Sequence, residues 1–148
     1  MKNKSERLKI VLDVAKRNEE KALDALTGKR RYRDQQLEQL EGLKSYHSQY
    51  MGTMKTEMTG GSMSVQRLQT YQSFMSQIDM AIEQQINTLQ IAQQEFDLAL
   101  INWTNYHQKR KGMSDLIDRY RQEEEIVREK KAQKYLEDDL TARRSHLR

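Results

Sequence analysis

A seven-residue repeat of apolar side chains runs through the second half of the chain and constrains its fold more than any other feature. From Leu68 to Tyr120, fourteen of its sixteen positions are apolar or aromatic. At an overall hydrophobic content of 36%, about six would be expected. The positions are Leu68, Tyr71, Met75, Ile78, Ile82, Gln85, Leu89, Ala92, Phe96, Ala99, Trp103, Tyr106, Arg110, Met113, Ile117 and Tyr120. A repeat sustained over seven heptads is typical of a helix that supercoils with another helix.

The first half of the chain carries a second apolar stripe that is less regular. Between Thr27 and Gln36 the stripe is interrupted by Gly28 and by a basic run from Lys29 to Arg33. We therefore expect a second helix with a local irregularity or kink at this segment. The members of the stripe are Leu8, Leu12, Ala15, Ala22, Leu26, Leu40, Leu43, Tyr50 and Met54.

The two stripes are separated by a segment with strong turn signals. Two adjacent glycines, Gly60 and Gly61, would cost about 2 kcal/mol inside a helix relative to alanine. Ser62 or Ser64 can cap the free N–H groups of the following helix. A short turn makes the flanking helices antiparallel neighbours. The sequence predicts an all-α fold, a single long two-helix antiparallel coiled-coil hairpin over residues 1–148, with a Gly-Gly turn near residues 59–64.

The predicted helices cover about residues 4–58 and about residues 65–140. The repeat fades after Tyr120, and we expect the charged segment beyond it to fray or to require a partner for order. Matching spacings on the two stripes predict the register of the two helices. In each of four opposed couples, the two residue numbers add up to 124. This centres the hairpin on Ser62 and brings the start of the first helix opposite Tyr120. The couples are Tyr50 with Phe74, Tyr46 with Ile78, Leu43 with Ala81 and Gln39 with Gln85.

Catalysis is not expected from these residues. The chain has no cysteine, and its three histidines, His47, His107 and His146, are far apart. No histidine–carboxylate grouping has metal-ligand spacing, and no glycine-rich phosphate loop is present. A pair of helices offers no pocket that excludes water from a reaction. We expect neither a cofactor, a metal nor an enzymatic activity. No apolar run reaches the ~20 residues of a membrane span, and Asp13 and Lys16 interrupt any signal-peptide core.

The net charge of +4 is unevenly distributed. Residues 1–33 carry 11 basic and 5 acidic groups, residues 34–108 carry 3 and 8, and residues 109–148 carry 12 and 9. Both ends are therefore basic and the middle is acidic, and a hairpin is expected to bring the ends together at one basic pole. Such a pole suits an acidic partner.

Several of these segments resemble the flagellar export protein family FliJ. The resemblance rests on Tyr71-Gln72-Ser73-Phe74, on Ala81-Ile82, and on Leu98-Ala99-Leu100-Ile101-Asn102-Trp103. In the first half it rests on Gln39-Leu40, Leu43, Tyr46 and Tyr50, and it covers nearly the whole chain. The resemblance implies a cytoplasmic component of the flagellar type III export apparatus, associated with the inner membrane only through its partners.

That resemblance implies three roles. The protein would bind the hexameric export ATPase as a central stalk and promote its assembly, link the ATPase to the membrane export gate, and handle empty export chaperones. The family favours histidine at the position of Gln85 and leucine at that of Ile78. The gate-binding residues implied are Gln39, Leu43, Tyr46, Tyr50, Phe74, Ile78, Ala81 and Gln85. Lys16, Arg17, Arg143 and Arg144, from the expected basic pole, are our candidates for contacting the ATPase ring.

Three other functions are compatible with the sequence. The first is the equivalent stalk of a virulence type III injectisome, which would share the fold and the mechanism. The second is a nucleic-acid-binding arm built on Lys29–Arg33 and the basic ends, although the acidic middle argues against nucleic acid as a partner. The third is a structural homodimer of uninterrupted helices, which the Gly-Gly turn disfavours.

Overall fold

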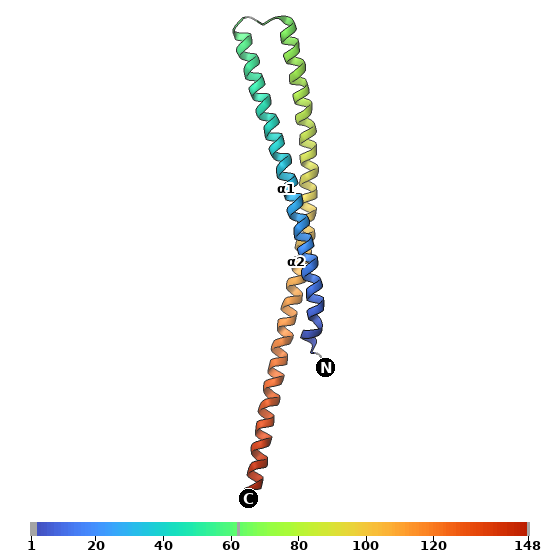
Figure 1. Cartoon of the computed structure of the whole chain (residues 1–148), viewed down its shortest axis with the longest axis vertical. Helices are drawn as coiled ribbons and strands as arrows, with labels where there is room; N and C mark the ends of the chain where they lie inside the picture. The colour runs from blue at the N-terminus through green and yellow to red at the C-terminus, as the bar shows by residue number, and fades with distance from the viewer. Residues whose placement is uncertain (1–2, 62, 148) are drawn as a thin grey trace. The chain divides into compact units, whose positions relative to one another are not determined.

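The computed structural model describes residues 3–61 and 63–147 and consists of two antiparallel helices joined by a turn (Figure 1). Helix α1 spans Lys4–Thr59 and helix α2 spans Val65–His146. The predicted all-α hairpin is confirmed. Helix α1 ends one residue beyond the predicted position, and α2 continues for six residues beyond it.

The turn ends α1 and starts α2 through local hydrogen bonds. The Gly60 N–H donates to the Thr56 carbonyl at 3.1 Å, and the Gly61 N–H donates to the Met58 carbonyl at 3.3 Å. Gly61 has a φ of +72°, a conformation that glycine adopts without steric cost. The Ser64 hydroxyl accepts a hydrogen bond from the Arg67 N–H at 3.2 Å and so caps α2 as predicted. Ser62, the other predicted cap and the predicted hairpin centre, lies outside the described residues.

The chain divides into two compact units, each made of antiparallel helical segments. The first, which we call the turn unit, comprises residues 23–102. The second, which we call the terminal unit, comprises residues 3–22 and 103–147 of the described chain. Each unit has its own small core.

The core of the turn unit lies along the predicted heptad positions of α2. Tyr71, Met75, Ile78 and Ala92 are buried, and so is Leu40 from the stripe of α1. Gln85 is the polar residue in this part of the repeat, and its side-chain amide is hydrogen-bonded. Its N–H₂ group donates to the Gln36 carbonyl at 3.0 Å and to the Gln36 Oε1 at 2.9 Å. A paired polar group inside an apolar seam favours one register over its neighbours.

The irregularity expected between Thr27 and Gln36 is not found, because α1 is unbroken there. Long basic side chains replace the missing apolar ones. The Lys29 ammonium lies 3.0 Å from the Glu95 carboxylate, and the Arg33 guanidinium lies 4.4 Å from the centre of the Phe96 ring. The aliphatic stems of such side chains cover apolar surface, so the helix packs without a continuous stripe.

The terminal unit packs α1 against α2 with fewer buried side chains. Ala22 and Ile117 form its core, and the polar heptad residue Arg110 donates to the Glu19 carboxylate at 2.6 Å. The Glu124 carboxylate accepts hydrogen bonds from the Ser5 hydroxyl at 2.6 Å and the Ser5 N–H at 3.2 Å. An acid at this place satisfies a free N–H of the first turn of α1 and complements the helix dipole.

One contact in each unit agrees with the predicted register. In the turn unit, Tyr50 and Phe74 are in ring contact at 4.8 Å, and their residue numbers add up to 124. In the terminal unit, the Lys4 ammonium lies 5.5 Å from the Tyr120 ring, again with a sum of 124. Helix α2 continues from Arg121 to His146, and every residue from Glu125 to Leu147 is exposed. High intrinsic helix propensity and ion pairs such as Arg143–Asp139, at 3.4 Å, favour helix in this segment.

Candidate functional site: an aromatic ridge beside the turn

Four aromatic side chains from both helices meet in the turn unit. We call Tyr46, Tyr50, Tyr71 and Phe74 the aromatic ridge. The ring centre of Tyr50 lies 5.1 Å from that of Tyr71 and 4.8 Å from that of Phe74. Tyr46 lies 6.2 Å from Tyr50 and 6.4 Å from Phe74, the latter in an edge-on arrangement. Aromatic pairs in this range attract each other beyond their burial of area, so the four rings support one another.

The ridge has a buried base and an exposed part, Tyr46 and Phe74, which we call the crest. Tyr71 is 8% exposed and Tyr50 is half-buried, whereas Tyr46 is 47% exposed and Phe74 is 37% exposed. Tyr46 and Tyr50 are four residues apart and Tyr71 and Phe74 are three residues apart, so each helix presents its two rings as neighbours on one face. The crest therefore offers a partner two rings that are already held in place, which lowers the conformational entropy lost on binding.

An ion pair next to the turn braces the ridge. The Arg67 guanidinium donates two hydrogen bonds of 2.8 Å to the Glu57 carboxylate and lies 6.0 Å from the centre of the Tyr71 ring. The hydrogen bond from Arg67, followed by one from Tyr71, lowers the pKa of Glu57. Desolvation by burial raises the pKa of Tyr50, and the negative charge of an ionised Tyr71 would raise it further. The Tyr50 hydroxyl therefore remains protonated at neutral pH. The crest itself consists of one phenol ring, Tyr46, and one phenyl ring, Phe74.

The structure does not expose all eight residues of the predicted gate-binding set. Ile78 is buried, as its seam position predicted, and Leu43 and Ala81 are half-buried. Gln39 is exposed, whereas Gln85 is half-buried and bonded to Gln36. With Tyr46, Tyr50 and Phe74 on the ridge, the set therefore combines exposed, half-buried and buried residues.

Sequence patterns missed part of this arrangement. Tyr71 was assigned to the helix seam alone, and Arg67 and Glu57 were not singled out. The available signal was the i, i+3 spacing of Tyr71 and Phe74, which brings two aromatic rings onto neighbouring positions of one helix.

The basic residues predicted to contact the ATPase fall into two groups in the terminal unit. Lys16 and Arg17 are exposed on α1, close to Glu19, which pairs with Arg110. Arg143 and Arg144 are exposed in the last turn of α2. At about 1.5 Å per residue, Arg143 lies about 50 Å along α2 from Arg110. The single basic pole predicted for the two ends is therefore wrong, since α2 continues well beyond the start of α1.

Two of the three histidines, His47 and His107, lie beside carboxylates. The His47 Nε2 lies 3.0 Å from Asp79, and the His107 Nδ1 lies 3.6 Å from Glu19, whereas the predicted sum of 124 places Gln77 and Arg17 opposite these two histidines. Two of the predicted opposite residues are thus displaced by two positions. The Arg110 hydrogen bond lowers the pKa of Glu19 and keeps this carboxylate charged. No group of three or more potential metal ligands occurs among the described residues.

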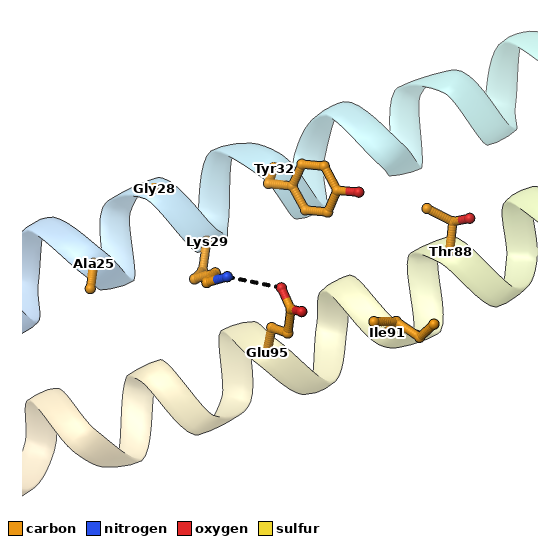
Figure 2. Close-up of a pocket in the computed structure, with 7 residues that line it drawn as sticks. All are labelled: Ala25, Gly28, Lys29, Tyr32, Thr88, Ile91 and Glu95. Carbon is orange, nitrogen blue, oxygen red and sulfur yellow. Dashed lines mark hydrogen bonds and ion pairs between the residues drawn. The ribbon is translucent and has the colours of Figure 1, made fainter.

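An open groove lies between the helices of the turn unit (Figure 2). It has a volume of about 500 Å³ and is crossed by the Lys29–Glu95 ion pair. Gly28, which the predicted sum of 124 places opposite Phe96, borders this open space, with no atom within 4 Å of the position that a Cβ would occupy. The groove is lined by Ala25, Gly28, Lys29, Tyr32, Thr88, Ile91 and Glu95. An open channel with one ion pair does not enclose a substrate.

None of the helices in residues 3–61 and 63–147 is long and apolar enough to cross a membrane.

Two long helices packed against each other along a heptad seam define an all-α helical-hairpin protein. A family model described as "Flagellar FliJ protein" matches residues 3–148. The chain therefore belongs to the flagellar FliJ family, whose members are non-catalytic cytoplasmic components of the flagellar export apparatus. No curated protein and no solved structure matches the chain.

Proposed function

We propose that this protein connects the flagellar export ATPase to the membrane export gate. The terminal unit binds the hexameric ATPase as a central stalk and promotes its assembly, and the aromatic ridge binds the gate. The observation that carries the proposal is the half-exposed pair Tyr46 and Phe74, held by contacts from both helices.

The ridge has the properties of a binding hot spot. Binding energy at protein interfaces is concentrated in aromatic side chains at the centre of the contact, which a surrounding rim shields from water. The two exposed rings of the ridge, Tyr46 and Phe74, are neighbours, and neither side chain is a carboxylate, ammonium or guanidinium group whose charge would have to be desolvated. Family membership in the export apparatus makes a protein of that apparatus the expected occupant, and we assign the gate to this surface.

The terminal unit has the properties of an electrostatic contact. Lys16 and Arg17 are exposed and make no ion pair among the described residues. Arg144 is exposed in the last turn of α2 beside Arg143. Free basic groups attract an acidic surface and accelerate association, and they do so most strongly at low salt.

The handling of empty export chaperones is the third part of the proposal. It follows from family membership and is supported by the exposed end of α2. Ile126, Val127, Leu136 and Leu140 are all more than half exposed there, and they offer apolar surface to a partner.

The alternative of a nucleic-acid-binding arm is less well supported by the geometry. Within the basic run, Lys29 is paired with Glu95, and Arg33 is paired with Asp34 and stacked on Phe96. Only part of the run is therefore available for phosphate contacts. The match to a flagellar family favours the flagellar system over a virulence injectisome.

Charge reversal tests the assignment of the terminal unit. We expect the double substitution Lys16→Glu and Arg17→Glu to weaken binding to the purified export ATPase at least tenfold at low salt. Arg143→Glu with Arg144→Glu should have a comparable effect. Binding is measured by surface plasmon resonance over a series of salt concentrations.

The matched control is Lys44→Glu with Lys55→Glu, two exposed lysines of the turn unit. It changes the net charge by the same amount and is expected to leave ATPase binding within about twofold of the original value. Unchanged ATPase binding by both terminal-unit variants would remove the assignment of the basic residues to the ATPase.

A further inference from the structure

One face of α2 lacks charge over a long distance. Alternating steps of four and three residues along α2, counted from Gln66, reach a row of positions on one side of the helix. All positions of this row as far as Ile101 carry uncharged residues. All of these positions are exposed and belong to the turn unit. We call them the uncharged face. Charged residues make up 32% of the chain and normally occupy the solvent side of a coiled-coil helix, so this face is unusual.

The uncharged face also carries large aliphatic side chains. Met80 is 60% exposed, Ile91 57%, Leu98 67% and Ile101 59%. The last three lie within three turns of α2, and their spacing puts them on one line along the helix. The exposed surface of α1 in the same unit differs, because Arg31, Glu38 and Glu41 are exposed there.

We infer that the uncharged face of α2 is a homodimer interface, occupied by the same face of a second copy of this chain. A two-fold interface brings each residue against the same patch of the other copy, so a patch with net charge would repel itself. The uncharged face meets this requirement along its whole length. Antiparallel packing of the two faces over their full length places Ile91 of one copy near Gln77 of the second copy, and Met80 near Asn87.

The polar members of the face are also self-complementary. Gln84, Asn87 and Gln94 carry side-chain amides, which both donate and accept hydrogen bonds. Two copies can therefore satisfy each other's amides, whereas a charged partner helix would bury its charges against this face without a counter-ion. The absence of cations on the face likewise argues against nucleic acid as its occupant.

The size of the face predicts a weak association. A strip about 50 Å long and about 10 Å wide buries about 500 Å² on each copy, which is near the lower limit for specific protein interfaces. We expect a dissociation constant on the order of 10–100 µM. Because each chain carries a net charge of +4, the two copies repel at long range. Salt screens this repulsion, so association should strengthen as salt increases.

Sedimentation equilibrium of the full chain tests the inference. From about 5 to about 500 µM protein, the mass should rise from the monomer value of 17.6 kDa towards twice that value, and the dimer fraction should increase with salt. The substitutions Ile91→Glu and Leu98→Glu together should weaken dimerisation at least tenfold. Both side chains are more than half exposed, and circular dichroism checks that the helices are retained.

The matched control replaces two exposed leucines of α1, Leu23→Glu with Leu37→Glu, and should dimerise like the unmodified chain. A mass of 17.6 kDa at every concentration would overturn the inference. So would dimers that persist in the Ile91→Glu and Leu98→Glu variant, or dimers that dissociate as salt increases, since charges would then hold the copies together.

Discussion

Phe74→Ala is expected to weaken binding of this protein to the cytoplasmic domain of the export gate at least tenfold. Phe74 is one of the two exposed rings of the aromatic ridge and contacts both Tyr46 and Tyr50. Truncation removes the ring that a partner would cover and also loosens the neighbouring Tyr46. Truncation of a central aromatic residue of an interface commonly costs about 2 kcal/mol or more of binding free energy. Isothermal titration calorimetry with the purified gate domain measures the loss.

The control for this substitution is Tyr135→Ala, which removes an aromatic ring that is 76% exposed in the terminal unit. It should leave gate binding unchanged. Phe74 is partly buried, so thermal unfolding of each variant must show that binding is lost from a folded chain. A folded Phe74→Ala variant that binds the gate domain with unchanged affinity would refute the ridge as the gate-binding surface.

Ile117→Ala is expected to lower the free energy of unfolding by about 2–4 kcal/mol. Ile117 is 2% exposed and is the largest fully buried side chain of the described residues. Its truncation removes buried apolar surface and leaves a cavity in the core of the terminal unit. Urea denaturation followed by circular dichroism measures the change.

Ile126→Ala provides the comparison, because it makes the same substitution on the same helix at a residue that is 52% exposed. The free energy of unfolding should change by no more than about 0.5 kcal/mol. Equal destabilisation by the two substitutions would show that the terminal unit is not held together by the heptad seam.

The heptad pattern predicted the core of the fold with little loss. The buried hydrophobic residues of α2 are Tyr71, Met75, Ile78, Ala92 and Ile117, and each occupies a heptad position. The stripe of α1 was equally informative, since none of its nine predicted members is exposed. Apolar periodicity is reliable here because two helices can bury apolar surface only along one seam.

Polar contacts could not be predicted in the same way. Glu124 lies beyond Tyr120, where the apolar repeat fades, yet its carboxylate caps the start of α1 through Ser5. Arg33 and Lys29 interrupt the stripe, yet they pack on Phe96 and pair with Glu95 without disturbing the helix. Such contacts depend on the reach and direction of long side chains, which residue spacing does not specify.

The candidate site was predicted in part. The opposition of Tyr50 and Phe74 followed from the register, and the two rings are in contact. The exposure of individual residues did not follow from it, because Tyr46, Phe74 and Ile78 all lie on or beside the seam and differ widely in burial. The brace formed by Arg67 and Glu57 adjoins the turn, where the heptad pattern ends.

A titration of this protein into the purified flagellar export ATPase tests the central claim most directly. Ring assembly, followed by sedimentation, and ATP hydrolysis are measured in the same samples at low salt. The proposal predicts that both increase and saturate near one chain per ATPase hexamer. Absence of association at low salt, or stimulation that continues to rise far beyond this ratio, would contradict a stalk role for this protein.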